Sequence, residues 1–201
     1  MNKRNSSVKF MTQLSLLIAV EIVMKLIGLG MVPIGPLKMS FLTVPVAIGA
    51  VVLGPSTGAI LGFVFGIISF YDALSGASVM TSTFLSISPV HTFILCVVTR
   101  TIMGWLVGMI AQGLKKGMKG NARYFIASFF APFLNTVFFM GYICIAFYNT
   151  DYVQALCSSL GATNPLMFVV LLVGLQGLIE VLACTIVGGA CSKGIDVVVN
   201  K

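Results

Sequence analysis

Apolar residues are grouped into six long runs along this chain, and polar residues gather between them. The runs lie at about residues 10–29, 41–53, 57–72, 92–114, 123–148 and 164–190. A helix needs about 20 apolar residues to cross a bilayer, and backbone groups in lipid must be hydrogen-bonded within the segment. The pattern therefore predicts an all-α membrane protein, a single integral membrane domain over residues 1–201 with six transmembrane helices in one bundle.

The connections between the runs are of two kinds. The second and third runs are short and separated only by "LGPSTG", a Gly-Pro turn that predicts a tight reversal between antiparallel helices. Three other connections, at 28–40, 72–91 and 148–165, are long and rich in Gly, Ser, Thr and Pro. They follow alternate runs, so they are expected on one face of the membrane, where long loops often form a binding site.

Basic residues are concentrated on the opposite face. They are Lys3, Arg4, Lys9, Lys115, Lys116, Lys119, Arg123, Lys193 and Lys201. Because Lys and Arg are retained on the cytoplasmic side of membranes, this distribution places the N- and C-termini in the cytoplasm. The net charge of +7 is explained by topology and by attraction to anionic lipids, and no nucleic-acid partner is expected.

The composition supports a membrane protein. Hydrophobic residues make up 58% of the chain and charged residues 8%, whereas a soluble domain has about 25% charged residues. The first run resembles a signal peptide, but no small-residue cleavage pattern follows it and Glu21 and Lys25 interrupt it. It is therefore expected to remain as the first helix. Glu21 and Lys25 lie four residues apart, a spacing that predicts an ion pair within that helix.

Signatures of catalysis are absent from the sequence. It contains no H-E-x-x-H, G-x-S-x-G, Walker A or G-x-G-x-x-G motif. His91 is the only histidine, and the five cysteines have no C-x-x-C spacing, so neither a metal site nor a disulfide framework is indicated. The chain is not expected to be an enzyme, to hold a cofactor or metal, or to hydrolyse ATP by itself.

Arg100 is the most unusual residue within the runs. It lies in "LCVVTRTIMGWLVG", eight residues after Thr92, which places it about 12 Å into the fourth helix. A charge at the bilayer centre costs about 2.5–3.5 kcal/mol on insertion scales. Two explanations remain open: an ion pair with Glu180, or an anionic ligand that matches the planar fork of guanidinium donors.

Other polar residues within the runs are candidates for substrate contact. Gln176 and Glu180 lie four residues apart on one face of the sixth helix, and Asn135 and Thr136 follow a proline in the fifth. Such groups either form hydrogen bonds between helices or contact a substrate, and the residues alone leave both readings open.

Small residues are spaced for close helix packing. Gly58, Gly62 and Gly66 form such a face on the third helix, and Ser15 and Ala19 on the first. Packing within the bundle and contact with another membrane subunit are both consistent with this spacing.

The segments "PIGPLKMSFLTVPVAIGAVVLGPSTGAILGFVFGIISF", "TFILCVVTRTIMGWLVGMIAQGLKK" and "IASFFAPFLNTVFFMGYICIAF" together resemble the substrate-binding S component of an energy-coupling factor (ECF) vitamin transporter. The most specific part is the pattern P-x-x-x-G-x-x-x-x-G-P-x-x-G within the first segment. The arginine of the fourth helix and the "NT" of the fifth are most similar to the pantothenate branch, and the riboflavin branch is close in the second and third helices.

The resemblance implies a substrate-binding and translocating subunit of an ATP-driven vitamin importer in the bacterial plasma membrane. Its partners would be a transmembrane coupling subunit and two cytoplasmic ATPase subunits, with Ser15 and Ala19 at the subunit interface. The expected substrate contacts are Arg100 for a carboxylate, Asn135, Gln176 and Asn164 for hydroxyls and an amide, Glu180, and Phe84 to His91 above the site. Another vitamin such as riboflavin, or an autonomous small permease, is the alternative.

Overall fold

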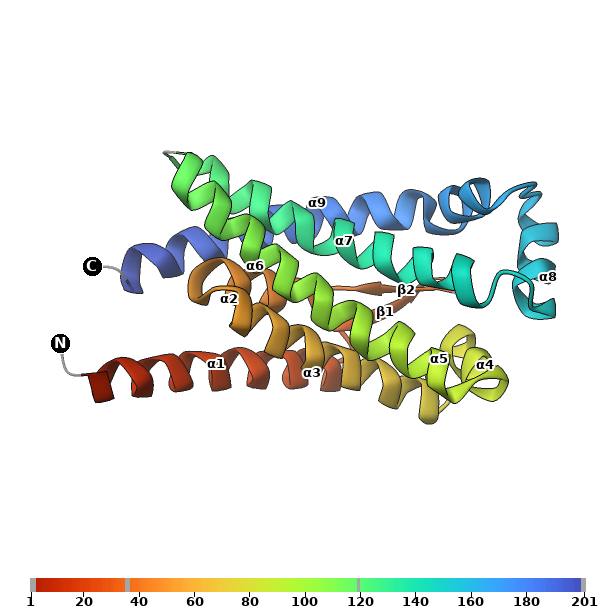
Figure 1. Ribbon diagram of the computed structural model, residues 1–201, viewed down its shortest axis with the longest axis horizontal. Helices are drawn as coiled ribbons and strands as arrows, with labels where there is room; N and C mark the ends of the chain where they lie inside the picture. Colours follow the sequence, from red (N-terminus) through yellow and green to blue (C-terminus); the bar gives the residue numbers. More distant parts are fainter. Residues whose placement is uncertain (1–2, 35–36, 119, 200–201) are drawn as a thin grey trace.

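Long helices run side by side along the molecule and follow the six apolar runs in order (Figure 1). The computed structural model describes residues 3–34, 37–118 and 120–199. The helices that correspond to the runs are α1 (Lys3–Leu26), α2 (Thr43–Leu53), α3 (Pro55–Leu74), α6 (Thr99–Gly117), α7 (Ala122–Ala146) and α9 (Pro165–Val199). Among the described residues the only sheet is a two-stranded hairpin, so the predicted all-helical class is confirmed.

The three long connections contain regular structure of their own. The first forms the antiparallel hairpin of β1 (Met31–Ile34) and β2 (Leu37–Ser40), with Met31 opposite Ser40. The second contains α4 (Val79–Ile87) and α5 (Pro89–Phe93), and the third contains α8 (Asp151–Leu160). In Figure 1, α4, α5 and α8 lie at one end of the bundle, while the start of α1, the end of α9 and the α6–α7 connection lie at the other.

Not all six helices have the length and apolar character of a membrane span. Four described segments have both properties, namely Pro55–Leu74, Pro89–Gly117, Ala122–Ala146 and Gln176–Val197. The number rises to five if α8 and the first part of α9, which are bent by 71° relative to each other, are counted as one span. With 11 residues, α2 is only about 16 Å long, and α1 is not among the four. The prediction of six spans is therefore not confirmed, and the side on which the termini lie remains a prediction.

Helix α9 is broken at Gly174. The backbone there has φ 39° and ψ −134°, a conformation that glycine adopts at low cost because it has no Cβ. Gln176, two residues beyond the break, begins the apolar segment Gln176–Val197. Irregular backbone at membrane depth is tolerated where it lines a cavity or is buried in protein.

Helices α3 and α6 approach each other closely. A Cβ added to Gly58 would lie 2.2 Å from the Gly104 carbonyl oxygen, and one added to Gly62 would lie 2.2 Å from the Arg100 carbonyl oxygen. The backbones are therefore in direct contact, as expected for small residues in membrane helix pairs. The predicted small-residue face of α3 is confirmed, and Gly58 and Gly62 on this face pack against α6 within the bundle.

The charged residues near the hairpin are paired differently from the prediction. Lys25 forms an ion pair with Asp72 of α3, so the expected Glu21–Lys25 pair is wrong. Glu21 is instead fully buried, with no hydrogen-bond partner on either carboxylate oxygen among the described residues. The Lys25 side chain contacts α3 because the buried carboxylate of Asp72 there carries the opposite charge. Lys119 and Lys201, two of the basic residues used for the topology, lie outside the described residues.

We expect Gly104→Ala to destabilise the protein, because its Cβ would lie 2.0 Å from the Gly58 carbonyl oxygen and both partners are backbone. Overpacking of this kind costs typically 1–3 kcal/mol, so the thermal unfolding midpoint in detergent should fall. Gly113→Ala, on the same helix with no atom within 4 Å of the added Cβ, is the control and should leave the midpoint unchanged or raise it. Equal midpoints for the two variants would contradict the contact.

Candidate substrate-binding site

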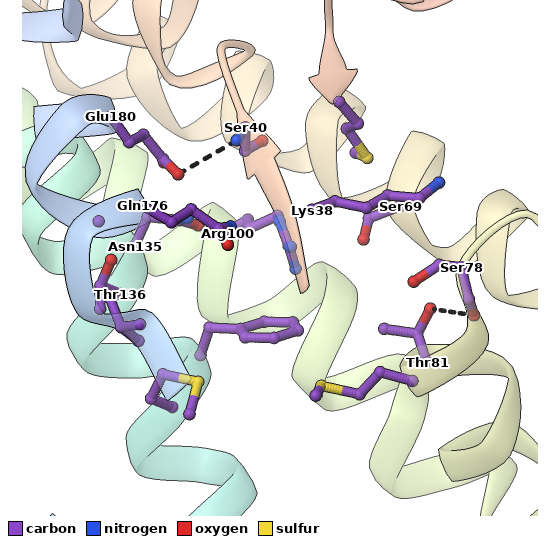
Figure 2. A pocket seen from close by; sticks show the side chains of 16 residues that line it. Lys38, Ser40, Ser69, Ser78, Thr81, Arg100, Asn135, Thr136, Gln176 and Glu180 are labelled. Atoms are coloured by element: carbon purple, nitrogen blue, oxygen red, sulfur yellow. Dashed lines mark hydrogen bonds between the residues drawn. The ribbon is translucent and has the colours of Figure 1, made fainter. Parts of the chain in front are cut away.

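A cavity lies between the hairpin and helices α3, α4, α6, α7 and α9. Its empty space is about 690 Å³, which includes the part that is open to solvent. The polar residues that line it are Lys38, Ser40, Ser69, Ser78, Thr81, Arg100, Asn135, Thr136, Gln176 and Glu180 (Figure 2). Met31, Met80, Phe139, Met140 and Val173 supply most of the apolar wall. A few polar groups on a mostly apolar surface are typical of small-molecule sites.

Four of the residues expected to contact a substrate line this one cavity: Arg100, Asn135, Gln176 and Glu180. They come from α6, α7 and α9. The break at Gly174 lies directly before the part of α9 that carries Gln176 and Glu180. The structure therefore brings together polar residues from three separate apolar runs.

The three other expected contacts lie outside the cavity lining. Phe84 is fully buried and stacks on Phe147, with ring centroids 4.2 Å apart. His91 is exposed, and its Nδ1 lies 2.8 Å from the Tyr142 hydroxyl. Asn164 is exposed and accepts a hydrogen bond from the backbone N–H of Met167 at 2.8 Å, at the start of α9. Phe84 and His91 thus join α4 and α5 to the end of α7, whereas Asn164 caps the start of α9.

Arg100 is buried beside a distorted turn. Residues Ile94–Val98 form a π-helical turn, a feature that is frequent at functional sites. The Nη1 group of Arg100 donates to the carbonyl oxygens of Leu95 at 3.3 Å and Cys96 at 3.1 Å. The chain thus stabilises the guanidinium with backbone carbonyls that belong to its own helix.

Two aromatic rings also contact the guanidinium. Its Cζ lies 4.5 Å from the centroid of Phe65 on α3 and 4.7 Å from that of Phe139 on α7. Cation–π contacts of desolvated cations are worth about 2 kcal/mol or more. Together with the two carbonyls they explain how Arg100, 6% exposed, is accommodated with no carboxylate in direct contact.

Glu180 does not form an ion pair with Arg100. Among the described residues, no Arg100–Glu180 contact falls within the 4.0 Å limit of an ion pair. Instead Glu180 Oε2 accepts a hydrogen bond from the backbone N–H of Ser40 at 3.1 Å, which ties strand β2 to α9. The explanation of Arg100 by a direct bridge to Glu180 is therefore wrong for this state of the protein.

Several buried polar atoms in the cavity wall have no hydrogen-bond partner in the described part of the chain. Among the described residues they are Ser40 Oγ, Arg100 Nε, Asn135 Oδ1 and Glu180 Oε1. Buried polar groups are nearly always hydrogen-bonded, and leaving one unpaired costs about 1–3 kcal/mol. Their concentration around one cavity indicates that a polar ligand, or water in its place, satisfies them.

The sequence analysis missed five polar residues of the cavity wall: Lys38, Ser40, Ser69, Ser78 and Thr81. Lys38 lies in the first long connection, at 28–40, and Asp72 begins the second, at 72–91; the two form an ion pair with 2.8 Å between Nζ and Oδ2. The opposite charges in neighbouring outer segments were the signal that could have indicated this pair. The four hydroxyl residues had no comparable signal. Ser40, Ser78 and Thr81 lie in connections rich in serine and threonine, and a single serine such as Ser69 is not conspicuous in an apolar run.

Ser15 and Ala19 lie on the exposed side of α1. Large apolar side chains are exposed beside them, among them Met11 at 65%, Leu16 at 65% and Ile22 at 46%. The side chains of this face are therefore largely exposed in the described chain and open to lipid or to another subunit.

We expect Glu180→Ala to destabilise the protein by about 1–3 kcal/mol, because it leaves the buried N–H of Ser40 without an acceptor. Glu180→Gln retains a carbonyl oxygen in the same place and serves as the matched control. Chemical unfolding in detergent measures both. If both variants lose the same free energy of unfolding, the carboxylate charge of Glu180, and not its hydrogen bond to Ser40, stabilises the protein.

Comparison with known proteins identifies the family to which the chain belongs. Residues 9–188 match the family described as "ECF transporter, substrate-specific component", whereas no curated protein matches the chain. Members of this family are transporter subunits that bind a small-molecule substrate and work with the other subunits of an ECF module in a membrane, and the family is not one of enzymes. The match covers most of the 201 residues, and the chain therefore belongs to the family of substrate-specific components of ECF transporters.

Proposed function

We propose that this chain binds pantothenate, a vitamin with one carboxylate, one amide and two hydroxyls, and carries it across the bacterial cell membrane. Arg100 holds the carboxylate in the cavity. Asn135, Gln176 and Glu180 receive the amide and the hydroxyls. The family match supports the transporter role, and the chemistry of the cavity wall supports this vitamin.

The free edge of the Arg100 guanidinium is the observation that carries the proposal. Its Nη1 is occupied by the carbonyls of Leu95 and Cys96, while Nε is buried with no hydrogen-bond partner among the described residues. Nε–H and Nη2–H lie on one edge of the planar group and match the two oxygens of a carboxylate. The protein thus fixes one edge of Arg100 and leaves the other for an anion.

The formal charges of the site favour a ligand with a single negative charge. Arg100 and Lys38 line the cavity together with Glu180, and Lys38 shares Asp72 with Lys25. Three cations and two carboxylates leave a net formal charge of +1. Because uncompensated charge in a low-dielectric site is costly, a monoanion such as pantothenate completes the balance.

The rest of the wall fits the rest of this vitamin. Asn135 Oδ1 and Glu180 Oε1 are unpartnered acceptors that suit hydroxyl or amide N–H donors. Met80, Phe139 and Met140 form an apolar surface for the branched dimethyl carbon. Riboflavin, the alternative, has a neutral ring system that would leave the free edge of Arg100 unused.

Transport follows from the partners that the family implies. We propose that a transmembrane coupling subunit contacts the exposed face of α1 at Ser15 and Ala19, and that two cytoplasmic ATPases drive reorientation of the loaded chain in the bilayer. Both termini and the basic α6–α7 connection then lie in the cytoplasm. The outer end with α4, α5 and α8 admits the vitamin.

Arg100→Met should weaken pantothenate binding by about 100-fold or more, the loss expected for hydrogen bonds to a charged donor. Arg100→Lys keeps the charge but not the bidentate edge, so an intermediate loss is expected. Isothermal titration calorimetry with purified protein measures both. Arg123→Met is the matched control, because Arg123 pairs with Asp196 and Tyr124 and is not part of the cavity lining. Wild-type affinity in Arg100→Met, or flavin absorbance in the purified protein, would refute the assignment.

Ala19→Phe should abolish ATP-driven pantothenate uptake by the complete complex in proteoliposomes, because a bulky ring blocks close helix approach. Binding to the isolated chain should stay within about twofold, since the site does not include α1. Ala155→Phe, an equally exposed position on α8 at the other end, is the control and should transport normally. Uptake by the chain alone, without its partners, would favour an autonomous permease instead.

A further inference from the structure

The cavity wall carries a second cation, Lys38 of strand β2. It lines the same cavity as Arg100, and its side chain is only 16% exposed. Its Nζ donates one hydrogen bond, to Asp72 Oδ2 at 2.8 Å. An ammonium group has three donors, so two N–H groups of Lys38 have no acceptor among the contacts of the described residues.

Asp72 holds Lys38 in place without cancelling its charge. The Asp72 side chain is 2% exposed, and its other oxygen, Oδ1, pairs with Lys25 of α1. One carboxylate shared by two ammonium groups leaves a net formal charge of +1. Lys25 is not part of the cavity lining, so Lys38 is the member of this trio that presents positive charge to the cavity.

Lys38 and the unpartnered acceptors of the cavity lie on opposite sides of Arg100 in Figure 2. In Figure 2 Lys38, Ser69, Ser78 and Thr81 lie to the right, Glu180, Gln176, Asn135 and Thr136 lie to the left, and Arg100 lies between the two groups. The unpartnered acceptors Glu180 Oε1 and Asn135 Oδ1 are both in the left group. An anionic group is therefore favoured between Arg100 and Lys38, and donor groups of the ligand are favoured toward Glu180 and Asn135.

We propose that Lys38, positioned by Asp72, is a second anion-binding residue of this site, so that Arg100 and Lys38 hold the substrate carboxylate from two sides. The hydroxyl and amide groups of the substrate then point to α7 and α9. Lys38 determines selectivity for an acid over its neutral analogue. This inference rests on the proposed function and adds to it the residue that selects the charge of the substrate.

The test compares pantothenate with pantothenol, in which a CH2OH group replaces the carboxylate, by calorimetry on the purified full chain. Wild-type protein should prefer pantothenate by about 100-fold or more, given two charged donors. Lys38→Met should lower pantothenate affinity by about 10-fold or more and leave pantothenol affinity unchanged, so that the preference falls. Lys38→Arg should retain most of the preference for pantothenate over pantothenol. Arg123→Met is the matched control, because Arg123 pairs with Asp196 and does not line this cavity, and it should keep the preference.

The role of Asp72 is tested in a double-mutant cycle. Asp72→Asn should change the preference in the wild-type background and have no further effect on it in Lys38→Met, because Asp72 acts through Lys38. An equal effect in both backgrounds would assign Asp72 a role of its own and overturn its positioning function.

The remaining outcomes separate the inference from the proposed function. If Lys38→Met weakens both ligands equally, Lys38 only supports the hairpin and the inference is overturned. If Lys38→Met leaves the preference unchanged while Arg100→Met reduces it, the inference fails and the proposed function stands. If wild-type protein binds neither ligand, the proposed function fails and the inference fails with it.

Discussion

The direct backbone contact between α3 and α6 is the constraint on which the site depends. Gly62 lies against the carbonyl oxygen of Arg100 itself, and Gly58 and Gly104 lie against each other. Helices that touch through their backbones have little freedom to rotate or slide, because every side chain that would keep them apart is missing. The Cα of Arg100 is therefore fixed relative to Phe65, which comes from α3 and contacts the guanidinium from one side.

A buried arginine without an acidic neighbour requires another source of stabilisation. Here it comes from groups that are polar but carry no net charge, the carbonyls of Leu95 and Cys96 and the rings of Phe65 and Phe139. This difference matters for binding. A carboxylate partner would neutralise Arg100 and compete with an anionic ligand, whereas carbonyls and rings leave the full charge in place. The π-helical turn at Ile94–Val98, which contains both of these carbonyls, is thus part of the anion site that we propose.

The sequence allowed the order of helices, the Gly-rich face of α3 and four of the cavity residues to be predicted. Periodicity and length are local properties, and a charge in an apolar run is conspicuous, so Arg100 and Glu180 were easy to find. The partners of Lys25 and Glu180 were not predictable in this way, because Asp72 and the backbone N–H of Ser40 lie 47 and 140 positions away in the chain. The break at Gly174 and the π-helical turn depend on how α9 and α6 pack, which no local pattern reveals.

The residues that attach the β1–β2 hairpin to the helices also line the cavity. Strand β2 is fixed to α3 by the Lys38–Asp72 ion pair and to α9 by the hydrogen bond from Ser40 to Glu180. Both attachments use residues that also line the cavity, so a ligand that contacts Lys38 or Glu180 acts on the same groups that hold the strand. Substrate binding and the position of this wall are therefore energetically coupled, since a ligand that prefers one arrangement of these groups shifts the protein toward it.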